Sequence, residues 1–132
     1  MQAMVWFQSA DLTNHEPEMM TVDQAIHAFK TYDWAQEAAL LEQLESAGEP
    51  CVPAGIKIGR DADGLHVCPM GGAKNVVFFD YSMPTRTFFG LLSSTKHKSD
   101  VARDLSDETC LELIRLFYDG DYETIAQRME GW

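Results

Sequence analysis

Residues 75–81, with the sequence NVVFFDY, constrain the fold of this 132-residue chain more than any other segment. Successive side chains of a β-strand point to opposite faces, so this segment would place apolar side chains on both faces. A strand of that composition belongs inside a sheet, with cover on each face. Residues 86–92, RTFFGLL, have the same character, and Pro84 is expected to end the first strand before the second begins. The two segments predict the centre of a β-sheet.

Two further strands are predicted upstream of this centre. Residues 56–58 and 65–67 alternate apolar and polar side chains around a stretch rich in Gly and Asp, which is typical of a β-hairpin. Residues 93–105 are polar and are expected to form a loop. Short connections join antiparallel neighbours, so the four strands predict an antiparallel meander.

Helix signals lie on both sides of this run of strands. Thr21 followed by Gln24 forms a capping box, and apolar residues at helical spacing come after it. The four predicted helices begin at Thr21, Asp33, Ser106 and Asp121. The element order α-α-β-β-β-β-α-α predicts the α+β class, with an antiparallel four-stranded meander packed with helices.

The chain has the length of one ordinary domain. Residues 21–132 contain all the predicted elements and are expected to form a single α+β domain. Residues 1–20 have a polar middle and four methionines. We expect this leader segment to dock on the core or on a partner through residues 5–7, VWF.

The chain is strongly acidic. It has 21 Asp and Glu residues against 10 Lys and Arg residues, which gives a net charge of −11 at pH 7. Such a charge repels phosphates and anionic lipids, so neither nucleic acid nor a membrane surface is an expected partner. The three cysteines have neither the even number nor the spacing of a disulfide framework, which indicates a cytoplasmic protein with reduced thiols.

His66 and Cys68 lie two residues apart on a predicted strand, so their side chains share one face. A thiol beside an imidazole can act as a nucleophile, but it needs a cation or a helix N-terminus that lowers its pKa, and the sequence shows neither. Cys51 would be the third ligand of a zinc site, yet the closely spaced ligand pair of such sites is missing. We therefore predict no catalytic residue, no metal and no other cofactor.

The predicted helix at 34–47 carries an acidic face. Its acidic residues and their neighbour beyond the helix end are Glu37, Glu42, Glu45 and Glu49. No Lys or Arg occurs between Lys30 and Lys57, so such a face would attract a basic partner and speed its association. The one local concentration of bases in the sequence comprises Lys96, His97, Lys98 and Arg103.

These features predict a small intracellular protein-binding domain, such as an adaptor, an inhibitor or an immunity-type protein, that uses its acidic or apolar surface. Its size and acidity are similar to those of bacterial immunity proteins and secretion chaperones, a similarity of composition that includes no motif. The alternative is a small enzyme or ligand-binding domain with a pocket between the sheet and the helix at 34–47. The candidate pocket residues are His66, Cys68, Phe78 and Phe88.

Self-association as a homodimer is also expected. Both faces of the predicted strands at 75–81 and 86–92 are apolar, whereas four short helices cover one face of a sheet well and the other only in part. A two-fold dimer is the commonest way for a small protein to bury the remaining surface.

Overall fold

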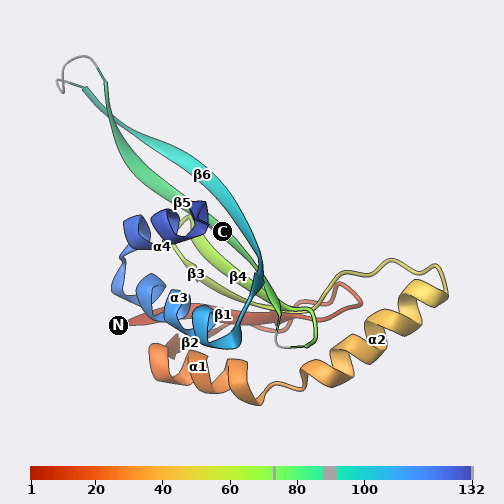
Figure 1. Ribbon diagram of the computed structural model, residues 1–132. Helices are drawn as coiled ribbons and strands as arrows, with labels where there is room; N and C mark the ends of the chain where they lie inside the picture. Colours follow the sequence, from red (N-terminus) through yellow and green to blue (C-terminus); the bar gives the residue numbers. More distant parts are fainter. Residues whose placement is uncertain (73, 88–91, 132) are drawn as a thin grey trace.

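A computed structural model of the chain describes residues 1–72, 74–87 and 92–131, and Figure 1 shows their arrangement. In chain order the elements are β1 (Gln2–Gln8), β2 (Glu18–Thr21), α1 (Val22–Thr31), α2 (Trp34–Ser46), β3 (Gly55–Arg60), β4 (Asp63–Pro69), β5 (Asn75–Thr87), β6 (Leu92–Leu105), α3 (Asp107–Asp119) and α4 (Tyr122–Glu130). All neighbouring strands are antiparallel. The α+β class predicted from the sequence is confirmed.

The sheet has six described strands in the order β2-β1-β3-β4-β5-β6, whereas the sequence predicted a four-stranded meander that follows two helices. The additional strands are β1 and β2, and they lie in residues 1–20, the expected leader segment, except for Thr21 at the end of β2. Strand β1 pairs with β3, and Val5 lies opposite Ile58 in the core. The sequence did not reveal β1 because Ala3 and Val5 alternate with residues that are themselves apolar, so no period of two is visible.

The β5–β6 pair corrects two further predictions. Strand β5 continues through Pro84 to Thr87, and residues 93–105 belong to β6 instead of a loop. Among the described strands, β4 pairs with β5 only as far as Asp80, so Pro84 has a described neighbouring strand on one side alone. A missing N–H is tolerated in that position. Phe88, which was predicted to lie in a strand, is outside the described residues.

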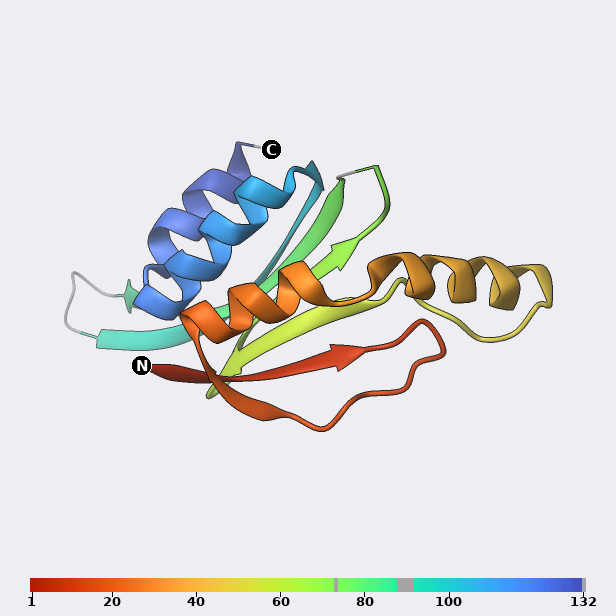
Figure 2. The same cartoon turned by 90° about the horizontal axis from the view of Figure 1, so that it is seen from below.

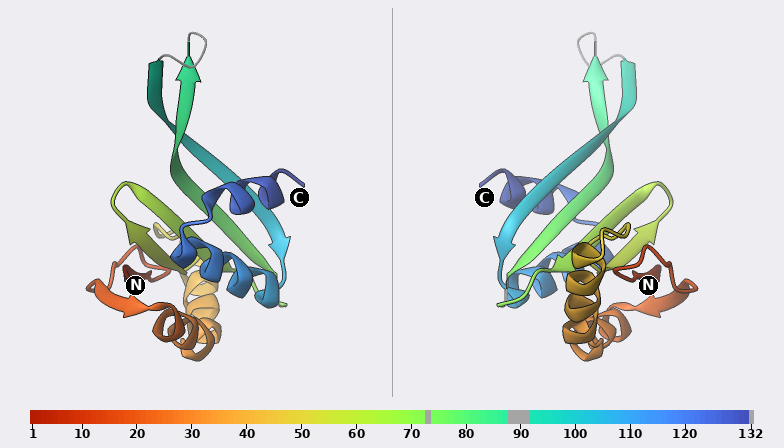
Figure 3. Two further views of the ribbon diagram at one scale, coloured as in Figure 1. Left: turned by 90° about the vertical axis from the view of Figure 1, so that its left-hand side faces the viewer. Right: turned by 90° about the vertical axis from the view of Figure 1, so that its right-hand side faces the viewer.

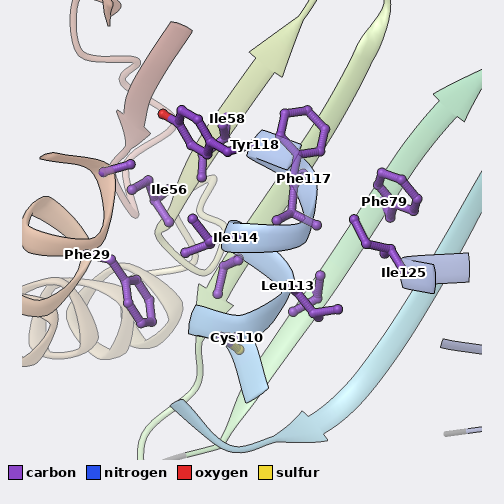
Figure 4. Close-up of a cluster of buried hydrophobic side chains, with 14 of the residues drawn as sticks. Phe29, Ile56, Ile58, Phe79, Cys110, Leu113, Ile114, Phe117, Tyr118 and Ile125 are labelled. Atoms are coloured by element: carbon purple, nitrogen blue, oxygen red, sulfur yellow. The ribbon is translucent and has the colours of Figure 1, made fainter. Parts of the chain in front are cut away.

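Helices α1, α3 and α4 pack on one face of the sheet (Figure 2). Alternate residues of the strands meet the apolar stripes of these helices and form the hydrophobic core (Figure 4). The largest fully buried side chains include Phe79, Phe117, Ile56, Ile58, Leu65, Leu113, Ile114 and Ile125. No helix of the described chain covers the opposite face of the sheet (Figure 2).

Local signals determine where the helices begin, as the sequence predicted. Oγ1 of Thr21 accepts a hydrogen bond from the N–H of Gln24 at 3.3 Å, and the side-chain oxygen of Gln24 accepts one from the N–H of Thr21 at 2.9 Å. Side-chain oxygens of Asp33, Ser106 and Asp121 accept from backbone N–H groups at the starts of the other three helices. Each cap satisfies an N–H that has no partner within its helix.

Two elements project from this body. Helix α2 has no buried residue. Beyond Asp80, residues 81–87 of β5 pair only with residues 92–98 of β6 among the described strands, and we call this two-stranded ribbon the arm. The outer part of the arm stands clear of the other elements (Figure 3), and α2 leaves the body at the opposite end (Figure 1).

Candidate functional site

The face of the sheet that lacks helices is hollowed into a groove of about 530 Å³. Five strands supply its floor, and residues before β3 and after β4 close one end. Its lining includes Trp6, Gln8, Pro53, Lys57, His66, Cys68, Met70, Val76, Phe78, Asp80 and Arg103. Apolar and aromatic side chains predominate, so the groove favours an apolar occupant.

Strand alternation places the apolar residues of this groove. On β5, Val77 and Phe79 point into the core and have no exposed area, whereas Val76 and Phe78 line the groove. Phe78 lies opposite His66 of β4, and the centroids of their rings are 5.6 Å apart. The apolar character of both faces of this strand therefore serves the core on one side and the groove on the other.

Two glycines of β3 make room for rings on this face. A β-carbon at Gly55 would lie 2.8 Å from Cδ2 of His66, and one at Gly59 would lie 3.3 Å from the ring of Trp6. A glycine inside a strand often marks such a close approach. The shape of the groove floor thus depends on positions 55 and 59 having no side chain.

His66 and Cys68 share one face, as the sequence predicted, and Nε2 of His66 lies 3.2 Å from Sγ of Cys68. Burial, together with the nearby charge of Lys57, lowers the pKa of His66 to about 4. Burial raises the pKa of the Cys68 thiol to about 11. At neutral pH the pair is an uncharged imidazole beside an uncharged thiol. It lacks the thiolate that a cysteine nucleophile requires.

The predicted pocket residues come together, but the pocket is not where the sequence placed it. His66, Cys68 and Phe78 all line the groove, and Phe88 lies outside the described residues. The helix predicted at 34–47 corresponds to α2, which contributes no residue to the groove lining. Helix α2 extends beyond the end of the sheet (Figure 2), so the pocket is formed by the open sheet face and by the residues before β3 and after β4.

The four glutamates predicted to bind a partner occupy different positions. Oε2 of Glu37 accepts a hydrogen bond from the N–H of Ala10 at 2.9 Å, so Glu37 anchors α2 to the connection between β1 and β2. Glu42 and Glu45 line a smaller hollow of about 200 Å³ between α2 and the residues around the ends of β3 and β4. Glu49 is exposed beyond the end of α2.

The groove and the acidic helix are neighbours. Pro53 and Met70 line both the groove and the smaller hollow beside α2. A segment that lay in the groove and continued past Met70 would therefore meet the carboxylates of Glu42 and Glu45. The apolar floor and the acidic helix form one continuous surface.

Sequence reasoning did not assign Trp6 or Arg103 to a site, although both line the groove. Trp6 lay within a segment expected to dock, and residues 3–7 are apolar throughout, so no alternation in the sequence assigns Trp6 to one face of a strand. Arg103 lay in an expected loop, and no local signal in the sequence brings it to the sheet.

Within residues 1–72, 74–87 and 92–131, no three His, Cys, Asp or Glu side chains are grouped as metal ligands would be. Cys51 accordingly does not join His66 and Cys68 in such a group. The same part of the chain contains no helix with the length and apolar content needed to cross a membrane.

Comparisons with known proteins give no relative from which a function could be inferred. No protein-family model and no curated protein matches the sequence, and no solved structure matches the fold.

Proposed function

We propose that this chain is an intracellular protein-binding domain whose groove holds an apolar segment of a partner protein. The observation that carries the proposal is the exposed apolar surface of the sheet face without helices. On this face Phe78 is 37% exposed, Val101 is 47% exposed and Met4 is 39% exposed. Apolar surface gathered on one face of a protein commonly marks an interaction site. The three cysteines are free thiols, which supports an intracellular location.

Charges beside the groove indicate what would flank the bound segment. Helix α2 presents Glu42 and Glu45 next to the end of the groove at Met70, and no Lys or Arg lies in α2 to neutralise them. A partner segment with basic residues after its apolar ones would be complementary to this surface. Opposite charges would speed its association and discriminate against acidic partners.

A second candidate function is the binding of a small apolar molecule. The groove volume of about 530 Å³ lies within the range of ligand pockets, about 300–1,000 Å³. Ligand pockets, however, bury most of their ligand, whereas this groove lies along a sheet face that no described helix covers. An extended protein segment fits an open groove better than a small molecule does.

Site-specific photo-crosslinking tests the proposal. A photoreactive phenylalanine analogue would replace Phe78 in one sample and Leu12 in the control. Leu12 is 44% exposed and lies in the connection between β1 and β2, away from the groove lining. In cells that express the full chain, we expect position 78 to capture a protein that position 12 does not.

The affinity of the purified captured protein then decides whether the groove is its site. Phe78→Asp is expected to weaken binding about tenfold or more, because the complex would bury an unpaired carboxylate. Leu12→Asp is expected to leave the affinity within about twofold. Equal capture at both positions, or unchanged affinity of the Phe78→Asp chain, would contradict the proposal.

A further inference from the structure

We propose that two copies of this chain associate about a two-fold axis, with the basic arm of each copy lying against the acidic helix α2 of the other. This association goes beyond the proposed binding function, because its contacts are those of the arm and α2 and not of the groove floor; Glu42 and Glu45, which lie beside the end of the groove, would be shared with the basic flank of a bound segment. Within one copy the outer part of the arm and α2 both project from the body, are opposite in charge and lie at opposite ends.

The arm is the basic part of an acidic protein. Between Asp80 and Asp100 the sequence contains no acidic residue. Its bases there are Arg86, Lys96 and Lys98, which give the segment a net charge of +3 within a chain of −11. Lys96 and Lys98 are exposed, and they share one face of β6 because they lie two residues apart.

In the described part of the chain, only the base of the arm packs against the rest of the protein, where Tyr81 is buried in the core, Met83 packs against it and the N–H of Ser82 donates to Oδ1 of Asp63 at 2.8 Å. Beyond the pair formed by Tyr81 and Lys98, each strand of the arm has only the other as its neighbour among the described strands. An isolated two-stranded hairpin is only marginally stable in water. Contact with a second surface would therefore stabilise the arm.

Helix α2 supplies a complementary surface. From residue 31 to residue 56 the sequence contains five acidic residues and neither Lys nor Arg. None of the 13 residues of α2 is buried, and its leucines remain only partly covered. Most of the stability of a helix of this length comes from packing of its apolar face. Helix α2 would therefore also gain from an intermolecular contact.

The positions of the arm and α2 prevent them from pairing within one copy. The arm contains the C-terminal end of β5 and the part of β6 paired with it. Helix α2 instead lies beside Pro69 and Met70, which precede the N-terminal end of β5. The two elements consequently leave the body at opposite ends (Figure 1, Figure 2). In the proposed dimer each arm lies beside the other copy's α2, and a two-fold interface makes this contact twice.

Charge reversal tests the dimer in sedimentation equilibrium at micromolar concentration. The unaltered chain is expected to have twice the monomer mass of 14.9 kDa. One variant carries Lys96→Glu with Lys98→Glu, and a second carries Glu42→Lys with Glu45→Lys. Each is expected to weaken dimerisation about tenfold or more, because like charges then face each other in both contacts.

A matched control separates this pairing from a general effect of net charge. Glu16→Lys with Glu18→Lys changes the net charge as much as the α2 variant does. Both glutamates are exposed, and neither lies on the arm or on α2. The control chain is expected to dimerise as the unaltered chain does.

An equimolar mixture of the two reversed variants is the decisive measurement. In the mixed dimer the reversed arm of one chain faces the reversed α2 of the other, and the native arm of the second chain faces the native α2 of the first. Both contacts then join opposite charges, so dimerisation is expected to return. A single chain with all four reversals keeps the net charge of −11 and should dimerise as well. A monomeric unaltered chain, reversed variants that dimerise normally, or a mixture that stays monomeric would overturn the proposal.

The Phe78→Asp chain distinguishes this proposal from the function of the groove. Phe78 belongs to neither the arm nor α2, so this chain is expected to dimerise normally even though it loses the partner captured at the groove. Loss of its dimer would place the interface on the groove face and overturn the pairing of the arm with α2. A normal dimer with normal partner affinity would instead overturn only the groove proposal.

Discussion

The imidazole of His66 occupies the space that the absent side chain of Gly55 leaves open across the β3–β4 pair. A β-carbon at position 55 would lie 2.8 Å from Cδ2 of His66 and 2.8 Å from the carbonyl oxygen of Val67, and closer still to Nε2 of His66. The backbone oxygen cannot give way, and the ring is held beside Cys68. The observed position of the His66 ring therefore requires a glycine at position 55.

Gly55→Ala should accordingly lower the free energy of unfolding by about 1–3 kcal/mol, as insertion of a methyl group into a packed site does. Urea denaturation measures the change. Gly64→Ala is the matched control, since a β-carbon at that strand glycine would meet nothing closer than 3.7 Å. Its effect should stay within about 0.5 kcal/mol. Equal effects of the two substitutions would show that His66 moves aside without cost.

Two neighbouring phenylalanines of β5 should respond differently to truncation. Phe79 has no exposed area, so Phe79→Ala is expected to lower the free energy of unfolding by about 3–5 kcal/mol. Phe78 is 37% exposed on the groove face, and Phe78→Ala should lower it by only about 1–2 kcal/mol. Chemical denaturation of both variants tests the assignment of faces, and a larger loss at Phe78 would reverse it.

His66 makes stability depend on pH in a defined window. Its pKa is lowered from the ordinary value of 6.5 to about 4 in the folded chain, mainly by burial. Between these two pH values the unfolded chain binds the proton more readily, so the stability that His66 contributes falls as the pH is lowered.

The comparison of the unaltered chain with His66→Phe isolates this effect from the many carboxylates. Between pH 6.5 and pH 4 the unaltered chain should lose up to about 1.4 kcal/mol per pH unit relative to the variant. Urea denaturation at several pH values gives both curves. A constant difference between them would mean that the folded chain protonates His66 as easily as the unfolded chain does.

The three thiols should react at very different rates. Cys68 and Cys110 are buried, and burial raises their thiol pKa values to about 11 and about 12. Cys51 is only partly buried. A disulfide reagent at pH 8 should therefore modify Cys51 first, and the other two only when denaturant is added. Cys51→Ser provides the control, and rapid labelling of that variant would contradict the neutral, buried state of Cys68.

Local sequence signals were sufficient for the helices and for the fold class. The capping box of Thr21 and Gln24 and the caps at Asp33, Ser106 and Asp121 lie where the helices begin. Capping involves residues within one turn of each other, so it can be recognised without knowledge of distant contacts. The apolar segment at 75–81 likewise identified a strand inside the sheet.

Tertiary structure decided the edges of the sheet and the place of the groove. Strand β1 exists because Val5 pairs with Ile58, more than fifty residues away, and Pro84 fits in β5 because no strand of the described chain lies on its other side there. The sequence determined that Phe78 and Phe79 face opposite ways and that both faces are apolar. Which face the helices cover depends on where α1, α3 and α4 pack, and that follows from long-range contacts that no local pattern contains.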